Sequence, residues 1–195
     1  MSDVVFDIET KNTFAEVGSS RSRDLDISLV GIYIYEADQY LAFRDDELDK
    51  LWPYIYGASR LIGYNSKYFD VPLLEKYAPR PLGSIPHLDL LVRIKDGLGH
   101  RLKLDDVAKA TLNYSKSGHG LQAVEWYKQG EWDKIEKYCL DDVKITKEVF
   151  EFGLKNKQLF YPDLSGIKPF PVDFTMPEAT EEEKELASSV QMSLL

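Results

Sequence analysis

Length, composition and charge limit the classes of protein to which this chain can belong. With 195 residues and a hydrophobic fraction of 44%, it can bury the core of one compact domain. The formal charge of −9 argues against a broad electrostatic grip on nucleic acid, and more than half of the excess lies in residues 173–195. No apolar run has the length of a membrane span, and the single cysteine, Cys139, fits a reducing compartment. We therefore expect a cytoplasmic protein with no membrane partner.

In chain order, the sequence predicts strands and helices in alternation. The expected elements are a strand at residues 4–10, a mobile polar loop at 11–26, strands at 27–35 and 39–43, a helix at 45–56, a buried strand at 60–64, helices at 71–77, 87–95, 104–112, 121–128 and 131–156, and strand-like segments within 158–174. This order indicates an α/β fold in which helices flank a mixed central sheet. We assign residues 1–174 to one domain and residues 175–195 to an acidic flexible tail.

The strand at residues 4–10 carries the most informative pattern. Its side chains alternate, so Asp7 and Glu9 share one face while Val4, Phe6 and Ile8 occupy the other. Two carboxylates side by side on an otherwise apolar strand repel each other, and burying them is costly unless a positive charge lies between them. A divalent metal ion would satisfy both. The strand therefore predicts part of a metal site.

The long helix carries another acid on its apolar face. With 3.6 residues per turn, Asp142 lies in the middle of a stripe that also contains Ile135, Tyr138, Cys139, Thr146, Val149 and Phe150. No Lys or Arg shares this stripe, so Asp142 needs another partner for its charge. Tyr138 lies one turn earlier, which directs its hydroxyl into the same space as the carboxylate. Tyr138 alone would be an ordinary core aromatic, and its pairing with a buried acid makes it a candidate site residue.

A further acid, Asp70, stands just before the helix expected at residues 71–77. The buried strand at 60–64 ends in a short polar turn that runs from Asn65 through Phe69 to Asp70. An Asp at a helix entrance often serves as an N-cap. Asp70 therefore has two interpretations, an N-cap or a further ligand of the same site.

Taken together, the four acids make a metal site the better interpretation. Asp7, Glu9, Asp70 and Asp142 come from a strand, a helix entrance and the middle of a helix. Ligand sets made only of oxygen select hard cations such as Mg²⁺ or Mn²⁺ over zinc. Several carboxylates that leave room for substrate phosphate oxygens are typical of a two-metal site that cleaves phosphodiesters.

These residues closely resemble the motifs of the DEDD-type 3′–5′ exonucleases of the DnaQ-like, ribonuclease-H-like superfamily. The motif Asp-x-Glu is matched by residues 7–9, within a sequence similar to that of family-B polymerase proofreading domains. The motif Asn-x-x-x-Phe-Asp is matched by residues 65–70, and Tyr-x-x-x-Asp by residues 138–142. The resemblance spans residues 1–155. It is to the tyrosine subclass, because the histidine subclass has His five residues before Asp142, where this chain has Lys137.

The resemblance implies a function and a role for each motif residue. Asp7, Glu9, Asp70 and Asp142 are expected to hold two Mg²⁺ or Mn²⁺ ions, and Tyr138 to orient the attacking water. Thr10, Asn65 and Phe69 are expected to contact the terminal nucleotide, with plain core packing as the alternative for Phe69. The implied activity is hydrolysis of single-stranded DNA from its 3′ end, in DNA repair or replication.

Two other functions remain open from the sequence. One is an exoribonuclease of the same fold, because the sequence shows no residue that reads the 2′-hydroxyl. The other is a catalytically silent module that binds nucleic acid or a sliding clamp. The terminal residues 191–195, Gln-Met-Ser-Leu-Leu, resemble the pentapeptide with which bacterial repair proteins bind the clamp, although a frayed terminus is the alternative.

Overall fold

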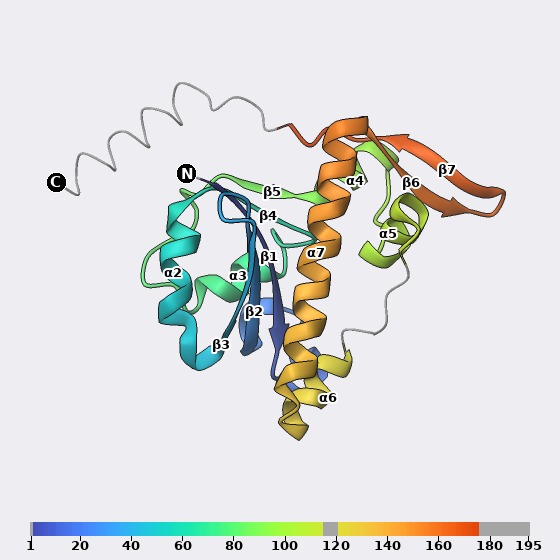
Figure 1. The fold of residues 1–195 in the computed structure, drawn as a ribbon. Coiled ribbons are helices and arrows are strands. Elements are labelled where there is room, and N and C mark those ends of the chain that lie inside the picture. The colour runs from blue at the N-terminus through green and yellow to red at the C-terminus, as the bar shows by residue number, and fades with distance from the viewer. Residues whose placement is uncertain (1, 115–120, 176–195) are drawn as a thin grey trace.

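The structure is a computed structural model that describes residues 2–114 and 121–175. Its centre is a five-stranded mixed sheet in the order β3-β2-β1-β4-β5 (Figure 1). The strands are β1 (Ser2–Thr10), β2 (Ile27–Ile34), β3 (Gln39–Arg44), β4 (Ala58–Gly63) and β5 (His87–Asp89). β4 runs parallel to β1 and β5 parallel to β4, whereas β2 is antiparallel to both β1 and β3. The expected mixed sheet is confirmed, with β1 at its centre.

Helices cover both faces of this sheet. They are α1 (Phe14–Val17), α2 (Leu48–Gly57), α3 (Asp70–Glu75), α4 (Leu90–Leu98), α5 (Leu104–Leu112), α6 (Leu121–Gln129) and α7 (Trp132–Asn156), with short 3-10 turns η1 (Ser22–Asp24) and η2 (Asp45–Glu47). Figure 1 shows α2 and α3 on one side of the sheet and the long α7 on the other. A separate hairpin of β6 (Gln158–Asp163) and β7 (Gly166–Pro171) follows α7. No helix within the described residues is both long and apolar enough to cross a membrane.

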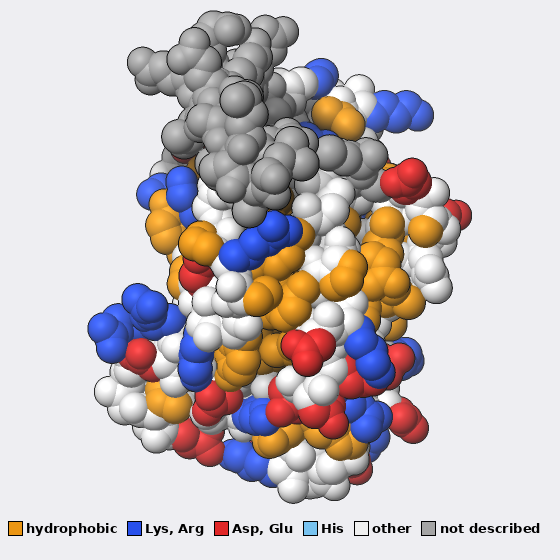
Figure 2. All heavy atoms as spheres, turned by 90° about the vertical axis from the view of Figure 1, so that its left-hand side faces the viewer, with side chains coloured by type: hydrophobic (Ala, Val, Ile, Leu, Met, Phe, Trp, Pro, Cys, Tyr) orange, Lys and Arg blue, Asp and Glu red, His pale blue; other side chains and the backbone are white. Residues whose placement is uncertain are grey.

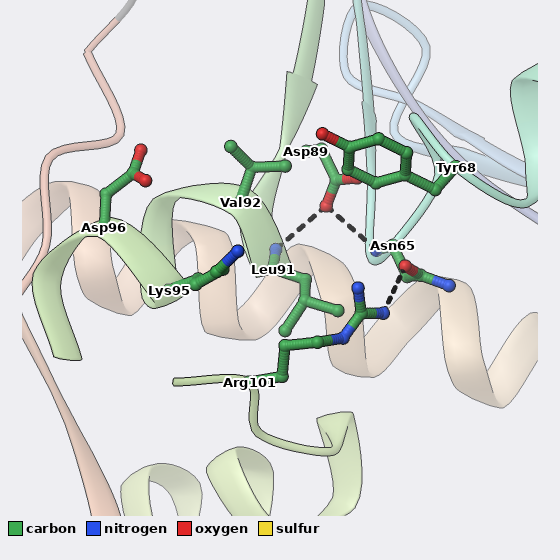
Figure 3. Close-up of a pocket in the computed structure, with 8 residues that line it drawn as sticks. All are labelled: Asn65, Tyr68, Asp89, Leu91, Val92, Lys95, Asp96 and Arg101. Atoms are coloured by element: carbon green, nitrogen blue, oxygen red, sulfur yellow. Dashed lines mark hydrogen bonds between the residues drawn. The ribbon is translucent and has the colours of Figure 1, made fainter. Parts of the chain in front are cut away.

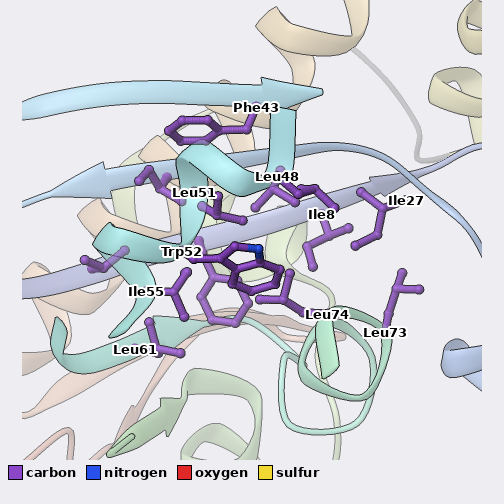
Figure 4. Close-up of a cluster of buried hydrophobic side chains, with 14 of the residues drawn as sticks. Ile8, Ile27, Phe43, Leu48, Leu51, Trp52, Ile55, Leu61, Leu73 and Leu74 are labelled. Atoms are coloured by element: carbon purple, nitrogen blue, oxygen red, sulfur yellow. The ribbon is translucent and has the colours of Figure 1, made fainter. Parts of the chain in front are cut away.

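The alternation of β1 divides the core into two layers. Val4, Phe6 and Ile8 belong to a buried cluster with residues of α2 and α3, part of which Figure 4 shows. Val5 belongs to the cluster on the opposite face, which α4, α5 and α7 cover. Residues 7 and 9 follow Val5 in the two-residue period of the strand. Asp7 and Glu9 therefore face the side of the sheet on which α7 packs.

A glycine on β2 allows α7 to approach the sheet at the position of Asp7. Gly31 is the register partner of Asp7. A Cβ atom added at Gly31 would lie 2.8 Å from the Sγ atom of Cys139 and 3.2 Å from a methyl group of Val143. Real Cβ atoms do not come that close to other heavy atoms, so a larger residue at position 31 would push α7 away from the sheet.

The structure differs from two expectations about local structure. Within residues 11–26, expected to form a mobile loop, Thr13 and Glu16 form a reciprocal capping box that begins α1. His87–Asp89, expected to open a helix, pairs with β4 as the short strand β5. Asp89 ends that strand, and its side chain caps α4 by accepting a hydrogen bond from the backbone N–H of Leu91 at 2.9 Å. The expected clamp-binding residues 191–195 lie outside the described residues, and their function stays a prediction.

The close contact at Gly31 makes a testable prediction. Replacing Gly31 with Ala overpacks the contact with Cys139, and we expect the free energy of unfolding to fall by about 1–3 kcal/mol. Chemical denaturation measures this change. Gly57→Ala is the matched control, because no atom lies within 4 Å of a Cβ added at that position. The double variant Gly31→Ala/Cys139→Ala should regain much of the loss, and an unchanged stability of Gly31→Ala would contradict the account.

Candidate active site

The site begins on β1, beyond the point where its pairing with β4 ends. β4 pairs with β1 only as far as the partners Val5 and Ile62, whereas β2 pairs with β1 along its whole length to Thr10. Asp7 and Glu9 lie in this second half of the strand. The side chain of Glu9 is buried and that of Asp7 is half-buried. The parallel strands β1, β4 and β5 all end at this edge of the sheet, which is where open α/β sheets commonly bind ligands.

The helix α7 brings Tyr138, Cys139 and Asp142 to the same place, and all three are buried. The thiol of Cys139 lies 3.5 Å from the backbone oxygen of Asp7 and 3.7 Å from its Oδ2 atom. Oxygen atoms of Asp7 and Glu9 and the Sγ atom of Cys139 all lie within 4.8 Å of one another. Burial raises the pKa of Cys139, and the negative charges of Asp7, Glu9 and Asp142 raise it further. The thiol therefore lies among three of the four predicted acids.

Asp70, the last of the predicted acids, lies at the start of α3, on the opposite side of β1 from α7. It is the first residue of α3 and is only 4% exposed. Its carboxylate accepts backbone hydrogen bonds from Ile8 of β1 and from its own N–H group. The N-cap residue of α3 is Phe69, which makes no side-chain cap bond. Asp70 thus connects α3 to β1. It is not the N-cap residue of α3, and its role as a metal ligand stays a prediction.

Burial gives Asp70 an unusual protonation equilibrium. Desolvation raises the pKa of Asp70 to about 8, and the nearby charge of Asp89 raises it as well, while the two backbone hydrogen bonds oppose the shift. A carboxyl group with this pKa is mostly neutral at pH 7. A cation bound beside it would favour the charged form instead. The residues present therefore fit a divalent metal ion.

The sequence analysis did not identify Asp89, which organises the loop before Asp70. Its carboxylate is buried and accepts hydrogen bonds from the backbone N–H groups of Asn65 and Lys67, each at 2.9 Å, in addition to that of Leu91. Asn65 adopts a left-handed backbone conformation with φ of 62°, which such a tight turn requires. An Asp between the apolar residues Leu88 and Leu90 was a visible N-cap signal in the sequence.

The three predicted nucleotide-contacting residues have different environments. The hydroxyl of Thr10 donates a hydrogen bond to the backbone oxygen of Asn12 at 2.9 Å. Phe69 packs against the α2–α3 core, and its ring also meets the half-exposed ring of Phe14 edge-on, with 6.1 Å between centroids. Both interpretations of Phe69, core packing and an aromatic surface for bases, are therefore compatible with its position.

Asn65 lies in a pocket on the side of the loop that faces α4 (Figure 3). Its Oδ1 atom accepts a hydrogen bond of 2.6 Å from the guanidinium of Arg101. The pocket has a volume of about 220 Å³ and is lined by Asn65, Tyr68, Asp89, Leu91, Val92, Lys95, Asp96 and Arg101. Tyr68 is 62% exposed, so much of its ring is accessible. Two cations and an accessible aromatic ring are groups that bind phosphates and bases of a single strand.

The face of the molecule that carries α2 is not predominantly basic. Figure 2 shows the side of the molecule on which α2 lies in Figure 1. There the Lys and Arg side chains of the described residues are interspersed with Asp and Glu. This distribution agrees with the acidic composition, which argued against a broad electrostatic grip on nucleic acid.

This chain is similar to a known protein family in sequence and to a known structure in fold. A family model of the ribonuclease H superfamily matches residues 4–152. The fold is similar to that of the family B DNA polymerase from the hyperthermophilic archaeon Pyrobaculum calidifontis, with a TM-score of 0.61 and 20% sequence identity. That match covers 79% of this chain and 24% of the polymerase chain. No curated protein sequence matches the chain. The chain belongs to the ribonuclease H superfamily.

Proposed function

We propose that this protein is a metal-dependent 3′–5′ exonuclease that hydrolyses single-stranded DNA, in DNA repair or replication. The observation that carries the proposal is the grouping of Asp7, Glu9 and Asp142 around the thiol of Cys139, with Tyr138 on the helix turn before Asp142. Asp70 supports it from α3, where its carboxylate accepts a hydrogen bond from the backbone of Ile8 on the same strand. Membership of the ribonuclease H superfamily supports a nuclease activity. The structural likeness to a DNA polymerase is consistent with a DNA substrate.

The four carboxylates would hold two Mg²⁺ or Mn²⁺ ions. Bound there, the metals would supply a water of lowered pKa and a positive charge for the leaving 3′-oxygen. Carboxylate oxygens suit these hard cations. The thiol of Cys139 is a soft ligand, which Mg²⁺ and Mn²⁺ do not prefer. Its contact with the backbone oxygen of Asp7 gives it a structural role instead.

The protein's own groups would hold the strand and the water. Tyr138 would orient the attacking water with its hydroxyl and would not remove the proton of that water. An unperturbed phenol, with a pKa of about 10, is protonated at pH 7 and cannot act as a base. Asn65 and Arg101 would contact the strand from the pocket of Figure 3, and Tyr68 would offer a ring for a base to stack on. Thr10 and Phe69 would border the terminal nucleotide.

The alternatives differ from this proposal in substrate or in chemistry. An exoribonuclease would use the same acids and differ only in its preference for RNA. A silent binding module would have no need to bury Glu9, Asp70 and Asp142 on β1 and the helices beside it, because buried carboxylates are costly without a cation. The buried acids therefore favour an enzyme.

The direct test is degradation of 5′-labelled single-stranded DNA and RNA of one sequence, with Mg²⁺, with Mn²⁺ or with EDTA. We expect a ladder that shortens from the 3′ end of DNA, needs the metal and disappears in Asp7→Asn. A preference for RNA would support the exoribonuclease instead. If neither strand is cleaved with either metal, the proposal is wrong and the binding module becomes the better interpretation.

The raised pKa of Asp70 predicts that this acid destabilises the metal-free protein. Between about pH 4 and pH 8 the unfolded chain releases the Asp70 proton while the folded protein retains it, so the free energy of unfolding falls as the pH rises. Asp70→Asn removes this cost. A gain of only 1 kcal/mol would raise the Tm by about 2–4 °C for a chain of this length.

Thermal denaturation in EDTA measures the effect. Asp70→Asn should raise the Tm at pH 8 and change it little at pH 4, while abolishing nuclease activity. Asp163→Asn is the matched control, because the exposed ion pair with Lys168 lowers the pKa of Asp163 and its loss brings no gain. A Tm of Asp70→Asn at pH 8 equal to or below that of the wild type would contradict the raised pKa.

A further inference from the structure

The helix α6 contacts the catalytic elements through three consecutive residues. Trp126 meets Tyr138 of α7, Tyr127 lies near Lys11 just after β1, and Lys128 forms an ion pair with Glu16 of α1. Successive residues of a helix point about 100° apart, so these three contacts lie on different sides of α6. α6 is therefore fixed against the end of β1 and against the turn of α7 that carries Tyr138.

The contact between Trp126 and Tyr138 is the one that bears on the chemistry. Their rings meet edge to face, with 5.9 Å between centroids and an angle of 67° between planes. This is a preferred geometry for aromatic pairs. Tyr138 is 7% exposed and Trp126 is half-buried, so the contact is largely shielded from water. Trp126 also packs against the small buried cluster around Leu29 and Cys139. Cys139 is the residue whose thiol lies among the acids.

We propose that Trp126 is a positioning residue, which holds the ring of Tyr138 in the orientation that its hydroxyl needs. The hydroxyl oxygen of a tyrosine lies on the axis of the ring torsion, and its O–H bond prefers the plane of the ring. Because that torsion is broad, neighbouring side chains decide the ring plane and with it the direction in which the O–H group donates. Functional groups in active sites act within about 10–20° of the productive geometry. The inference rests on the proposed function, because it assigns Trp126 a role through the water-orienting Tyr138.

Further contacts fix Trp126 through its helix. The Nζ atom of Lys128 lies 2.7 Å from a carboxylate oxygen of Glu16, and Glu16 completes the capping box of α1. The Nζ atom of Lys11 lies 5.5 Å from the ring centroid of Tyr127. These contacts keep α6 from shifting along α7. Trp126 is thereby a fixed surface against which Tyr138 rests.

The first test is a kinetic double-mutant cycle with single-stranded DNA. Trp126→Ala should lower kcat about tenfold with KM changed less than about twofold, because strand contacts lie elsewhere. In the Tyr138→Phe background the same substitution should have no further effect on kcat. Trp132→Ala is the matched control: it removes the same side chain from the same small cluster, and its ring meets Tyr127 rather than Tyr138. Losses that multiply in the double variant, or an equal loss in Trp132→Ala, would overturn the proposal.

A second readout does not depend on catalysis. In protein labelled with ¹³C at the tyrosine ring, the Tyr138 resonance is assigned by its absence from Tyr138→Phe. It should shift or broaden in Trp126→Ala and remain in place in Trp132→Ala, while the melting temperatures show that each variant is folded. An unchanged Tyr138 resonance in Trp126→Ala would overturn the positioning role. If the wild-type protein cleaves no strand, the proposed function fails and this measurement still decides the contact.

Discussion

The close approach of α7 to the central sheet is the contact on which the candidate site depends. It is possible because Gly31, the register partner of Asp7, has no side chain where Cys139 and Val143 pack. The helix consequently carries Cys139 to within hydrogen-bonding distance of the backbone of Asp7. Asp142 follows Cys139 by three residues and lies on the same buried face. A single missing side chain on a neighbouring strand thus allows acids separated by 135 positions in the sequence to meet.

The same contact places negative charges where water has little access. Packing that suits the apolar core on either side of β1 would leave these carboxylates poorly solvated without a cation. Asp70, buried at the start of α3 on the other side of β1, shows what burial does to an acid, since desolvation raises its pKa to about 8. The protein therefore gives up stability at this place, as proteins commonly do at functional sites. We infer that the acids are kept for their chemistry and not for the fold.

Sequence periodicity singled out Asp7, Glu9 and Asp142 because each departs from a regular apolar pattern, whereas Asp70 stood at a helix entrance and broke no such pattern. Asp7 and Glu9 interrupt an alternating strand, and Asp142 interrupts a helical stripe, so their shared location followed from one-dimensional rules. The sequence held a signal for Asp89 as an N-cap, but not for its hold on the loop backbone at Asn65 and Lys67, a tertiary contact that no local pattern encodes. The strand β5 was missed for a similar reason. Three residues become a strand only because β4 pairs with them. The contact of Trp126 with Tyr138 likewise depends on how α6 packs against α7.

The central claim is that the acids form a divalent-metal centre. A calorimetric titration of the metal-free protein with Mn²⁺ tests this claim most directly. The account predicts saturable binding of two ions at pH 8, lost or strongly weakened in both Asp7→Asn and Asp142→Asn, with the fold intact by circular dichroism. Asp7→Asn removes a charge on β1, and Asp142→Asn removes a charge that the close approach of α7 brings to the site. Mn²⁺ binding that is absent from the wild type, or equally tight in both variants, would contradict it.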